Sequence, residues 1–574
     1  MKIILGINAY HADSSACILI NGKIVAAIEE ERINRKKHFS GFPTESIKEC
    51  LKIANLNSEQ INDVAFNTSP FKNFFSKIFF LIKNLKIQNN NFIKKIDKKI
   101  NVKKKLVDTF KLNKDIKFHY IEHHLAHIAS AFYASGIEKA YGLSIDGSGD
   151  FVTFALSQCN RNKIKLIKKI FFPNSLGIFY HAMTQFLNFN NYGDEYKVMG
   201  MAAYGSPKYF NKIKDNLFIE NNNDEFKLNL KYFNHHKHDF KYIAGENLEI
   251  DRIYNDELVN LFNDDFNNPS ENDSFSKNFA ASVQKVYEYF FEIILKNINL
   301  KNYSKNIVFA GGCALNSSAN RFITNSNLFD EKYIPFAPGD NGGALGAALS
   351  VAARYHKRLD NTKTPFLGKQ FSNNEINKIL ESKFYINKVK YELLKSEEDL
   401  LQIATKLISD GKVIGWFQGK MEFGPRALGN RSIIADPRNP EMKSIINKKI
   451  KRRESFRPFA PSVLEEYQSE WFECSFKNPY MSSLSNVKKD KQRLVPAITH
   501  VDGTARLQTV SKNSNLRFYN LINCFNKLTK VPILLNTSFN ENEPIVMKPE
   551  EALDCLLRTD MDALFLNDFF VEKI

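Results

Sequence analysis

Residues 3–28, with the sequence IILGINAYHADSSACILINGKIVAAI, decide the fold, because they open an internal repeat. The apolar run at 3–8 predicts a buried strand, and the polar residues at 11–15 predict a loop. Two further apolar runs flank Asn21-Gly22, which is a strong signal for a two-residue β-hairpin turn. The expected order is therefore strand, polar loop and hairpin.

The same order returns at residues 141–170. An apolar strand at 141–145 leads into the loop Asp146-Gly147-Ser148-Gly149-Asp150, and two strand-like runs then flank the turn residues 160–162. A pattern that occurs twice indicates a duplicated lobe. Lobes of this kind enclose a nucleotide in the actin and sugar-kinase architecture, where such loops approach the phosphates, so we expect an α/β domain of that class.

Two glycine-rich turns each follow a predicted strand, at 307–310 and at 333–336, and open a helix. One is Gly311-Gly312-Cys313-Ala314-Leu315-Asn316, and the other spans residues 338–346. Backbone N–H groups and the helix dipole at such turns favour an anion, although close packing of a helix on a strand also requires glycine. Neither turn has the G-x-x-x-x-G-K-[ST] pattern, which excludes a P-loop.

His123 and His127 lie four residues apart in a segment that reads as a helix. Side chains at this spacing share one helix face, with Cβ atoms about 5–6 Å apart, so both imidazoles can reach one metal ion. Position 124 is His, so the glutamate of an H-E-x-x-H metalloprotease is missing. Core or surface histidines are the alternative. A second cluster lies in an Asn/Lys-rich stretch that we expect to be a solvated loop: His235, His236 and His238.

Composition bounds the class of protein. The 574 residues predict two to four domains, and 43% hydrophobic with 25% charged residues is typical of a soluble globular protein. The seven cysteines include no C-x-x-C pair, which argues against disulfides and a thiolate zinc site. The first apolar run is too short for a signal peptide, and no run approaches 18 apolar residues. We therefore expect a cytoplasmic protein without a transmembrane segment.

The net charge of +17 is concentrated in residues 71–120, which carry 14 lysines and 3 aspartates. Residues 74–83 have the pattern of a basic amphipathic helix. The simplest interpretation of the segment is a helical insertion with a lysine-coated face. Peripheral contact with a membrane surface, or with an anionic or lipid-linked acceptor, is the second interpretation, and nucleic acid is the least favoured.

Composition shifts around residues 360–369, where we expect a domain boundary. Downstream, residues 420–457 hold eleven basic and four acidic residues, with the arginines set among Gly, Pro and Phe. Convergent arginines on ordered loops suit a compact dianion such as a phosphate, which they bind in a bidentate manner. Residues 536–540 form a polar cluster that ends an apolar strand at 531–535, and strand ends are where open α/β sheets place ligands. The set predicts a phosphate site, whereas each arginine alone also fits a surface salt bridge.

In combination these motifs resemble those of the NodU/CmcH family of O-carbamoyltransferases, which includes the nodulation-factor and tobramycin enzymes. The resemblance extends from Gly6 to residue 574, and the loop at His11 is one residue longer than in some members. No single motif would suffice, but the set is specific: residues 29–32, 35–38, His123-x-x-x-His127, 175–177, 192–200, 311–316, 424–431, 456–462 and 536–540.

The resemblance implies a two-domain enzyme. Residues 1–362 would form an actin-like (ASKHA) duplicated-lobe domain that binds ATP and a metal, and residues 363–574 a YrdC-like α/β domain that binds carbamoyl phosphate. In such enzymes carbamoyl phosphate is broken down in the C-terminal domain and the carbamate is adenylated with ATP. The carbamoyl adenylate then reacts with an acceptor hydroxyl in the N-terminal domain.

Carried onto this sequence, the resemblance implies four metal ligands: His123, His127, Asp146 and Asp340. This donor set suits Fe(II), Mn or Zn, and the resemblance favours iron. His11 would be the general base, since imidazole titrates near neutrality. Lys37 would offset transition-state charge, with the neighbouring Lys36 as an alternative.

The remaining residues implied by the resemblance bind the two phosphate-containing substrates. The nucleotide would face Gly311, Gly312, Asn316, Gly342 and Gly343. Carbamoyl phosphate would be held by Arg426, Arg431, Lys451, Arg457, Arg506, Asn536 and Ser538.

The expected function is ATP-dependent O-carbamoyl transfer to a hydroxyl of a sugar or natural-product acceptor, which the motifs do not identify. Its strongest rival is threonylcarbamoyl-type modification of tRNA, with the lysine-rich segment as an RNA tether. A third class is a non-catalytic nucleotide-binding regulator, which would not need both sets of candidate residues. A homodimer is compatible with the sequence.

Overall fold

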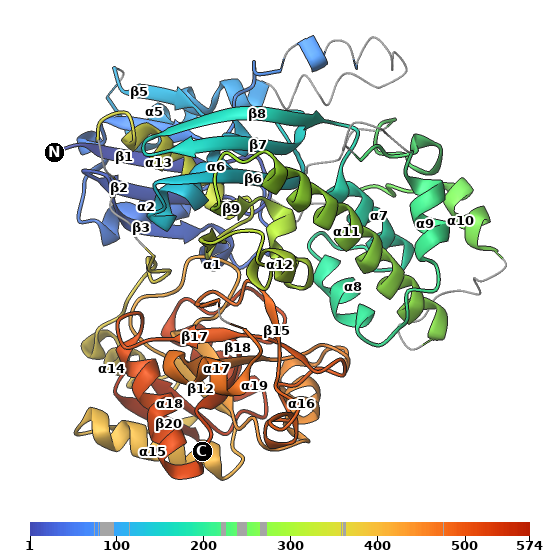
Figure 1. Cartoon of the computed structure of the whole chain (residues 1–574). Helices are drawn as coiled ribbons and strands as arrows, with labels where there is room; N and C mark the ends of the chain where they lie inside the picture. Colours follow the sequence, from blue (N-terminus) through green and yellow to red (C-terminus); the bar gives the residue numbers. More distant parts are fainter. Residues whose placement is uncertain are drawn as a thin grey trace. The chain divides into compact units, whose positions relative to one another are not determined.

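The computed structural model describes residues 1–73, 75–77, 80, 97–113, 115–219, 226–237, 250–263, 273–356, 359, 363–474 and 476–574. These residues form two compact units, Met1–Lys363 and Thr364–Ile574. Both units are mixed α/β (Figure 1). Most of the predicted amphipathic helix at 74–83, and His238, lie outside the described residues.

The first unit contains two five-stranded sheets of one topology. In each sheet a central strand pairs with an antiparallel hairpin on one side and with two parallel strands on the other. The orders are β3-β2-β1-β4-β5 and β8-β7-β6-β9-β10, so the duplicated lobe expected of the actin-like class is confirmed. The strands are β1 (Ile3–Asn8), β2 (Ser15–Ile20), β3 (Lys23–Glu29), β4 (Asp63–Phe66), β5 (Lys117–Tyr120), β6 (Lys139–Gly149), β7 (Val152–Asn160), β8 (Lys163–Phe171), β9 (Ile307–Ala310) and β10 (Lys332–Tyr333).

The predicted hairpin turn has the expected backbone. Asn21 and Gly22 have φ values of 49° and 82°, which are the positive angles that a two-residue turn between β2 and β3 requires. This turn sets the register in which Ile20 faces Lys23. The hairpin therefore directs the polar loop at 9–14, which precedes β2, to one end of the sheet.

Two equivalent helices occupy the centre of the unit. In the two lobes α6 (His123–Ser135) follows β5 and α13 (Asn341–Ala352) follows β10. The two helices pack against each other, α13 also on β1 and β2, and α6 also on β6 and β9. A Cβ atom at Gly346 of α13 would lie 1.8 Å from the Ala126 carbonyl oxygen, so only glycine permits this approach.

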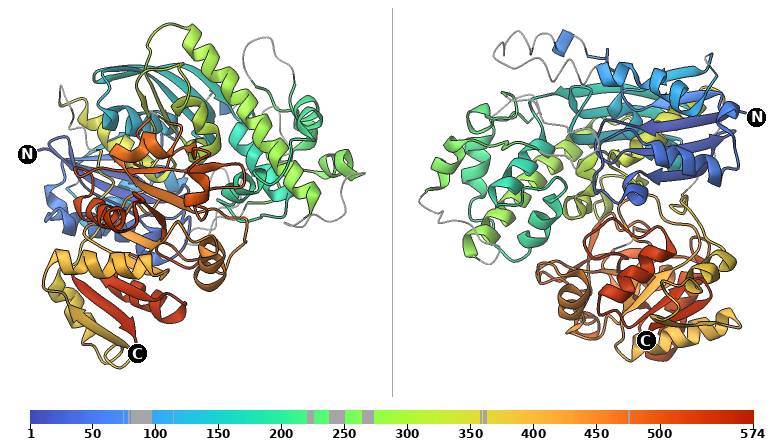
Figure 2. Two further views of the ribbon diagram at one scale, coloured as in Figure 1. Left: turned by 60° about the horizontal axis from the view of Figure 1, so that its bottom comes forward. Right: turned by 180° about the vertical axis from the view of Figure 1, so that it is seen from behind.

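The other helices of the first unit flank the sheets or follow β8. The long helix α11 contacts α7, α8, α9 and α12, and both views of Figure 2 show it extending beside them. These helices are α1 (Glu31–Asn34), α2 (Thr44–Ile53), α5 (Val102–Phe110), α7 (Leu176–Phe186), α8 (Glu195–Ala202), α9 (Phe210–Leu217), α10 (Asp256–Phe262), α11 (Ser274–Leu300) and α12 (Ser317–Thr324).

The second unit is built on an eight-stranded mixed sheet in the order β11-β20-β19-β12-β13-β18-β14-β17, with a separate β15–β16 pair. Trp416 and Phe565 are fully buried in its core. The strands are β11 (Val389–Leu393), β12 (Ile414–Phe417), β13 (Arg431–Ala435), β14 (Ala460–Leu464), β15 (Leu484–Asn486), β16 (Thr504–Arg506), β17 (Gln508–Val510), β18 (Ile533–Ser538), β19 (Ala563–Leu566) and β20 (Phe569–Lys573). The helices are α14 (Asn373–Leu380), α15 (Glu397–Ser409), α16 (Met442–Ile445), α17 (Gln468–Trp471), α18 (Leu516–Thr529) and α19 (Pro549–Arg558).

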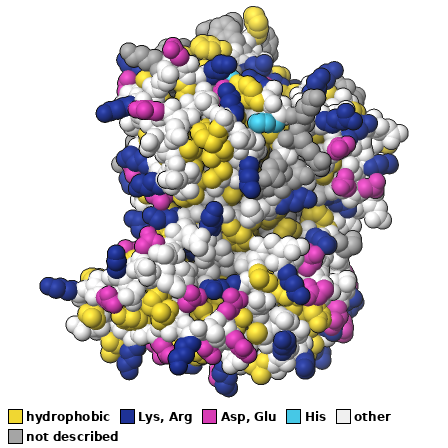
Figure 3. Space-filling view, turned by 90° about the vertical axis from the view of Figure 1, so that its left-hand side faces the viewer, with side chains coloured by type: hydrophobic (Ala, Val, Ile, Leu, Met, Phe, Trp, Pro, Cys, Tyr) yellow, Lys and Arg dark blue, Asp and Glu magenta, His cyan; other side chains and the backbone are white. Residues whose placement is uncertain are grey.

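The described part of the lysine-rich segment contains α5. Val102, Leu106 and Phe110 are buried at helical spacing, while residues 103–105, all lysines, are exposed, so this part is a helix with a lysine-coated face. On the face drawn in Figure 3, Lys and Arg side chains are dispersed among Asp and Glu. Among the described residues, no helix is long and apolar enough to cross a membrane.

Candidate metal centre and anion site

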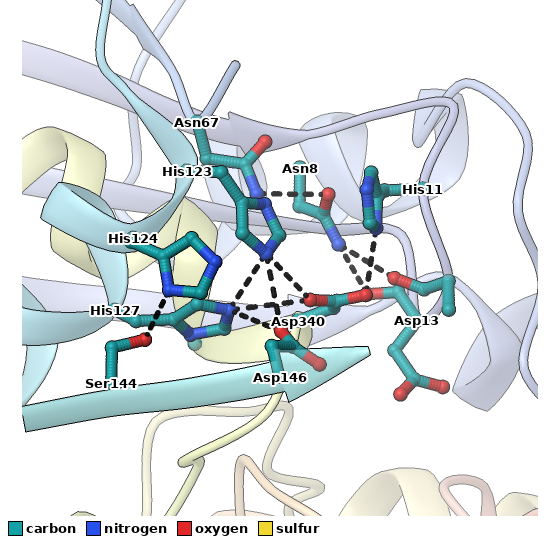
Figure 4. A network of polar contacts seen from close by, with 12 residues as sticks. Asn8, His11, Asp13, Asn67, His123, His124, His127, Ser144, Asp146 and Asp340 are labelled. Atoms are coloured by element: carbon teal, nitrogen blue, oxygen red, sulfur yellow. Dashed lines mark hydrogen bonds and ion pairs between the residues drawn. The ribbon is translucent and has the colours of Figure 1, made fainter. Parts of the chain in front are cut away.

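Four side chains from three elements of the first unit converge on one point (Figure 4). His123 and His127 come from the first turns of α6, Asp146 from β6, and Asp340 from the residue before α13. One nitrogen or oxygen atom from each lies within 4.8 Å of the others. The structure therefore brings together all four metal ligands implied by the sequence, which we call the ligand group.

Both imidazoles of the ligand group point at the same two carboxylates. The Nε2 atom of His123 lies 3.2 Å from Asp146 Oδ2 and 3.4 Å from Asp340 Oδ1. The Nε2 atom of His127 lies 3.0 Å and 3.3 Å from the same two oxygens. The two Nε2 atoms are 2.9 Å apart, a separation at which two lone pairs repel unless a proton or a metal ion lies between them.

The electrostatics of the ligand group favour a cation. Burial opposes the charged form of His127, but the carboxylates of Asp146 and Asp340 outweigh burial and raise its pKa to about 9. Burial and the charge of His127 lower the pKa of His123. Burial alone would raise the pKa of both carboxyl groups, but the imidazoles outweigh it and hold each pKa below its usual range. Two carboxylates then face one imidazolium, which leaves a net negative charge.

This donor set fits a divalent metal. Asp340 Oδ1 is buried and has no hydrogen-bond partner among the described residues, although it faces both imidazoles. Two imidazole nitrogens and two carboxylate oxygens suit Fe(II), Mn(II) or Zn(II) alike. A metal bound here would replace the proton shared in the ligand group, so metal binding and deprotonation of His127 would be linked.

Local backbone features place the first histidine of the ligand group. Asp150 accepts a hydrogen bond from the His123 backbone N–H at 3.0 Å, which satisfies a free donor at the start of α6. A Cβ atom at Gly149 would lie 2.0 Å from the His123 ring, so glycine is required there. The pairing of β6 with β7 is irregular between Ile145 and Gly149, and this irregularity directs Asp146 toward the helix.

The third histidine of the helix has a structural role. His124 contacts Ser144 Oγ at 2.8 Å through Nδ1 and the Val152 carbonyl oxygen at 2.9 Å through Nε2 (Figure 4). Burial and the neighbouring His123 lower its pKa to about 3, so its ring is neutral near pH 7. The core-histidine alternative therefore holds for this residue.

His11 lies directly beside the ligand group. Its Nδ1 atom is 2.7 Å from Asp340 Oδ2, and its ring lies 4.7 Å from that of His123 (Figure 4). The Asn8 side chain holds the loop by donating to the carbonyl oxygens of Ala12 and Asp13. Because Nδ1 donates to Asp340, the lone pair of neutral His11 is on Nε2, which has no hydrogen-bond partner among the described residues.

His38, the residue after Lys37, reaches this loop. Lys36 and Lys37 are exposed, whereas Nδ1 of His38 lies 2.8 Å from Asp13 Oδ1. Burial lowers the pKa of His38, but Asp13 and Glu31 outweigh burial and raise it to about 9. The Asp13–His38 pair was not predicted, because no sequence pattern links an imidazole to a carboxylate 25 residues away.

The five residues expected to face the nucleotide lie in the two glycine-rich turns, at 311–316 and 338–346. Gly311 has a φ of 98°, and a Cβ atom at Gly312 would lie 2.8 Å from Asp146 Oδ1, so this turn abuts the ligand group. The Asn316 side chain caps α12 by accepting from Ala319 N and also pairs with Gln284. The remaining two lie in the first turn of α13, two and three residues after Asp340, and pack closely on Ala337 and Asn67: Gly342 and Gly343.

Four arginines of the second unit influence one another electrostatically. Burial lowers the pKa of Arg506 well below its usual value, and the charges of Arg426, Arg453 and Arg457 lower it further. Burial also lowers the pKa of Arg426 to about 10. In the described part of the chain, neither Arg426 nor Arg506 pairs with a carboxylate. Partly buried cations that repel one another are a candidate anion site, and Arg453 is a member that the sequence did not predict.

The other expected carbamoyl phosphate residues serve mainly to hold the loops around these arginines. Arg431 is fully buried, and its terminal nitrogens donate to the carbonyl oxygens of Gln418, Asn430, Lys369 and Gly419. Lys451 donates to four oxygens of Ser538 and Asn540. Asn536 donates to Ala427, Ser462 and Gln508, and its Oδ1 atom is buried without a partner among the described residues.

Residues 536–538 are the last residues of β18, where Asn536 pairs with Ile434 and Ala460, so the polar cluster does end an apolar strand as predicted. One expectation about a loop was wrong. His235 is not solvated: it is buried, contacts the Pro173 carbonyl oxygen at 2.9 Å and packs on Phe172. Burial lowers its pKa to about 4. The polar residues around His235 led to the wrong prediction of a solvated loop, because its ring is a neutral imidazole in the core.

Two family models match this chain. One, described as the carbamoyltransferase N-terminus, matches residues 3–349, and the other, described as the carbamoyltransferase C-terminus, matches residues 405–573. An uncharacterised protein of Synechocystis sp. is 38% identical over 100% of this chain and 97% of its own length. Nodulation protein NolNO of Sinorhizobium fredii is 34% identical over 99% of this chain and 80% of its own.

Solved structures give weaker matches. Full-length HypF in its phosphate- and nucleotide-bound form matches with a TM-score of 0.30 and 14% identity over 67% of this chain and 47% of its own. Component A of the (R)-2-hydroxyglutaryl-CoA dehydratase of Acidaminococcus fermentans matches with a TM-score of 0.34 and 13% identity over 62% of this chain and 100% of its own.

Proposed function

This chain belongs to the carbamoyltransferase family, and we propose that it is an ATP-dependent O-carbamoyltransferase that uses carbamoyl phosphate to modify an acceptor hydroxyl. The observation that carries the proposal is the hydrogen bond of His11 to Asp340, which couples a candidate base to the ligand group. A site of this kind suits attack by a hydroxyl beside a bound nucleotide.

The proposed reaction has three steps. Carbamoyl phosphate and water give carbamate and phosphate in the second unit. Carbamate then attacks the α-phosphorus of ATP, which gives carbamoyl adenylate and pyrophosphate. Finally the acceptor oxygen attacks the carbamoyl carbon, AMP leaves with the electrons of the broken C–O bond, and the hydroxyl proton passes to His11 Nε2.

In the last step Asp340 orients His11 and stabilises the imidazolium that forms, because its Oδ2 accepts from Nδ1. Gly311, Gly312, Asn316, Gly342 and Gly343 would face the nucleotide, and Lys37 would offset charge from the exposed side. A divalent metal held by the ligand group, which we propose to be Fe(II) with Mn or Zn as alternatives, would supply positive charge for the nucleotide oxygens.

In the second unit Arg426, Arg453, Arg457 and Arg506 would bind the phosphate of carbamoyl phosphate. Their mutual repulsion supports this, since a dianion would relieve it. Arg431, Lys451, Asn536 and Ser538 would hold the site in shape and complete it around the carbamoyl group. Modification of tRNA would need a basic surface for RNA, which the exposed lysines in the described part of the lysine-rich segment, those of α5 among them, would have to provide.

The test uses purified full-length protein loaded with Fe(II) under anaerobic conditions. We expect release of pyrophosphate only when both carbamoyl phosphate and ATP are present, and a carbamoyl adduct when sugar nucleotides or cell extract are added, detected by mass spectrometry. Absence of carbamoyl phosphate-dependent pyrophosphate release would reject the proposal. Adduct formation on tRNA instead would favour the rival function.

A further inference from the structure

The turn before β16 carries an imidazole to which the proposed reaction gives no task. His500 opens a tight turn: its backbone N–H donates to the Thr504 carbonyl oxygen at 2.8 Å, and Gly503 N–H donates to the His500 carbonyl oxygen at 2.9 Å. Its ring contacts Thr504 Oγ1 at 3.3 Å. Thr504 and Arg506 are alternate residues of β16, so their side chains leave the strand on the same face. His500 therefore lies on the Arg506 side of the strand.

Asp502 determines which ring nitrogen of His500 carries the hydrogen. The Thr504 hydroxyl lies 2.7 Å from Asp502 Oδ1 and must donate to it, because an ionised carboxylate only accepts. The hydroxyl oxygen can then only accept from the ring, which assigns the hydrogen to Nδ1 and the lone pair to Nε2. Burial lowers the pKa of His500 to about 4, and the charges of Arg506 and Lys443 lower it too. The charge of Asp502 and a hydrogen bond with the Phe459 backbone oppose this change. The ring is therefore neutral near pH 7.

Several buried acceptors in this unit have no donor among the described residues, Oε2 of Glu422 and of Glu550 included. Nε2 of His500 and Oδ1 of Asn536 both lack a hydrogen-bond partner among the residues that the structure describes. Asn536 is oriented by donating to Ala427 beside Arg426, and His500 by its contact with Thr504 beside Arg506. Since buried polar atoms are almost always paired, two unpaired acceptors next to the arginines indicate a ligand that brings N–H groups.

A phosphate group by itself cannot pair these atoms, because its oxygens accept and the arginines already supply donors. Carbamoyl phosphate has phosphate oxygens at one end and an amide NH2 with two donors at the other. We propose that His500 is a specificity-determining residue whose Nε2 accepts a hydrogen bond from this amide. Asn536 Oδ1 accepts the second hydrogen. This inference rests on the proposed function and adds recognition of the carbamoyl nitrogen to it.

The test compares two stable probes that differ only in NH2 against CH3, phosphonoacetamide and acetonylphosphonate, by calorimetric titration of the full-length protein. A site that pairs an amide discriminates against an analogue that leaves its acceptors unpaired, so we expect wild-type protein to prefer phosphonoacetamide by ~10-fold or more. In His500→Asn the preference should fall to within ~3-fold of unity. The asparagine amide can keep the Thr504 contact but has no atom at the Nε2 position. Binding of inorganic phosphate, which needs only the arginines, should be unchanged.

A second variant and a control keep the test decisive. His500→Phe fills the same space without a nitrogen, and it should also lose the preference if the asparagine variant does not fold. His235→Asn removes another buried neutral imidazole, from the first unit, and should keep the wild-type preference. If either folded His500 variant keeps the wild-type preference, the inference about His500 is overturned, whereas the proposed function is not affected. If wild-type protein binds neither phosphonoacetamide nor inorganic phosphate, the proposed carbamoyl phosphate site itself is wrong.

Discussion

His11 and Asp340 are joined by a 2.7 Å contact between Nδ1 and Oδ2, although 329 residues separate them in the chain. The other oxygen of the same carboxylate, Oδ1, faces Nε2 of both His123 and His127. One side chain therefore orients the candidate base and completes the ligand group. Removal of His11 and removal of Asp340 should consequently have different effects.

Replacing His11 with glutamine should separate the two steps of the first unit. We expect acceptor-dependent AMP release to fall by ~10²–10⁴-fold, the usual contribution of a positioned base, while pyrophosphate release with carbamoyl phosphate continues. His119→Gln is the matched control, because that imidazole also pairs with a carboxylate, Asp63, but outside the ligand group. Equal loss of both activities in His11→Gln would argue that His11 only maintains the structure.

Replacing Asp340 with asparagine should weaken metal binding. An asparagine keeps the shape but loses the charge, so we expect the protein to retain less than about one tenth of the wild-type metal after Fe(II) loading and desalting, measured by atomic emission. Asp150→Asn should lose less, because an amide oxygen can still accept from His123 N–H. Asp256→Asn, at the exposed start of α10, is the control. Wild-type metal content in Asp340→Asn would contradict the ligand group.

Replacing Arg506 with methionine should improve stability and abolish substrate use. Holding this guanidinium away from water and near three others makes the free energy of folding less favourable. Its removal should therefore raise the thermal midpoint by a few degrees. Phosphate release from carbamoyl phosphate should fall by at least ~10²-fold. Arg438→Met removes an arginine paired with Asp436 and should lower the midpoint without affecting phosphate release. A lower midpoint in Arg506→Met would show that the cluster is already neutralised.

The Asp13–His38 pair should make stability depend on pH. The pKa of His38 is raised from 6.5 to about 9 in the folded protein, so its contribution is fully present below pH 6.5 and is lost as pH rises through about 9. Because both side chains are partly exposed, we expect a modest effect. The urea midpoint of wild-type protein should fall between pH 6.5 and 9 more steeply than that of His38→Gln. Parallel curves would mean that the pair does not stabilise the fold.

The sequence predicted local elements well where pattern and turn chemistry agree. Asn21-Gly22 fixed the first hairpin, and β9 has the predicted bounds 307–310, because an apolar run between turns leaves little choice of register. The strand predicted at 333–336 is shorter, since β10 ends at Tyr333. The repeat could be predicted because the two lobes share one order of strand, polar loop and hairpin, although their residues differ.

The sequence could not predict contacts that depend on the third dimension. The resemblance, and not spacing, assigned Asp146 and Asp340 to the histidines, and Arg453 was missed because an arginine in a basic run looks like its neighbours. His235 was misjudged because polar flanking residues outweighed its apolar contacts with Phe172 and Phe233. Burial decides the role of such residues, and burial is a property of the folded chain.

The equivalence of α6 and α13 gives the ligand group donors from both lobes. Each of the two helix starts contributes donors, while β6 supplies Asp146 and the loop after β1 brings His11 to Asp340. Any hinge rotation of one lobe against the other would therefore change every distance in the centre at once. A bound cation would therefore hold the two lobes of the first unit together.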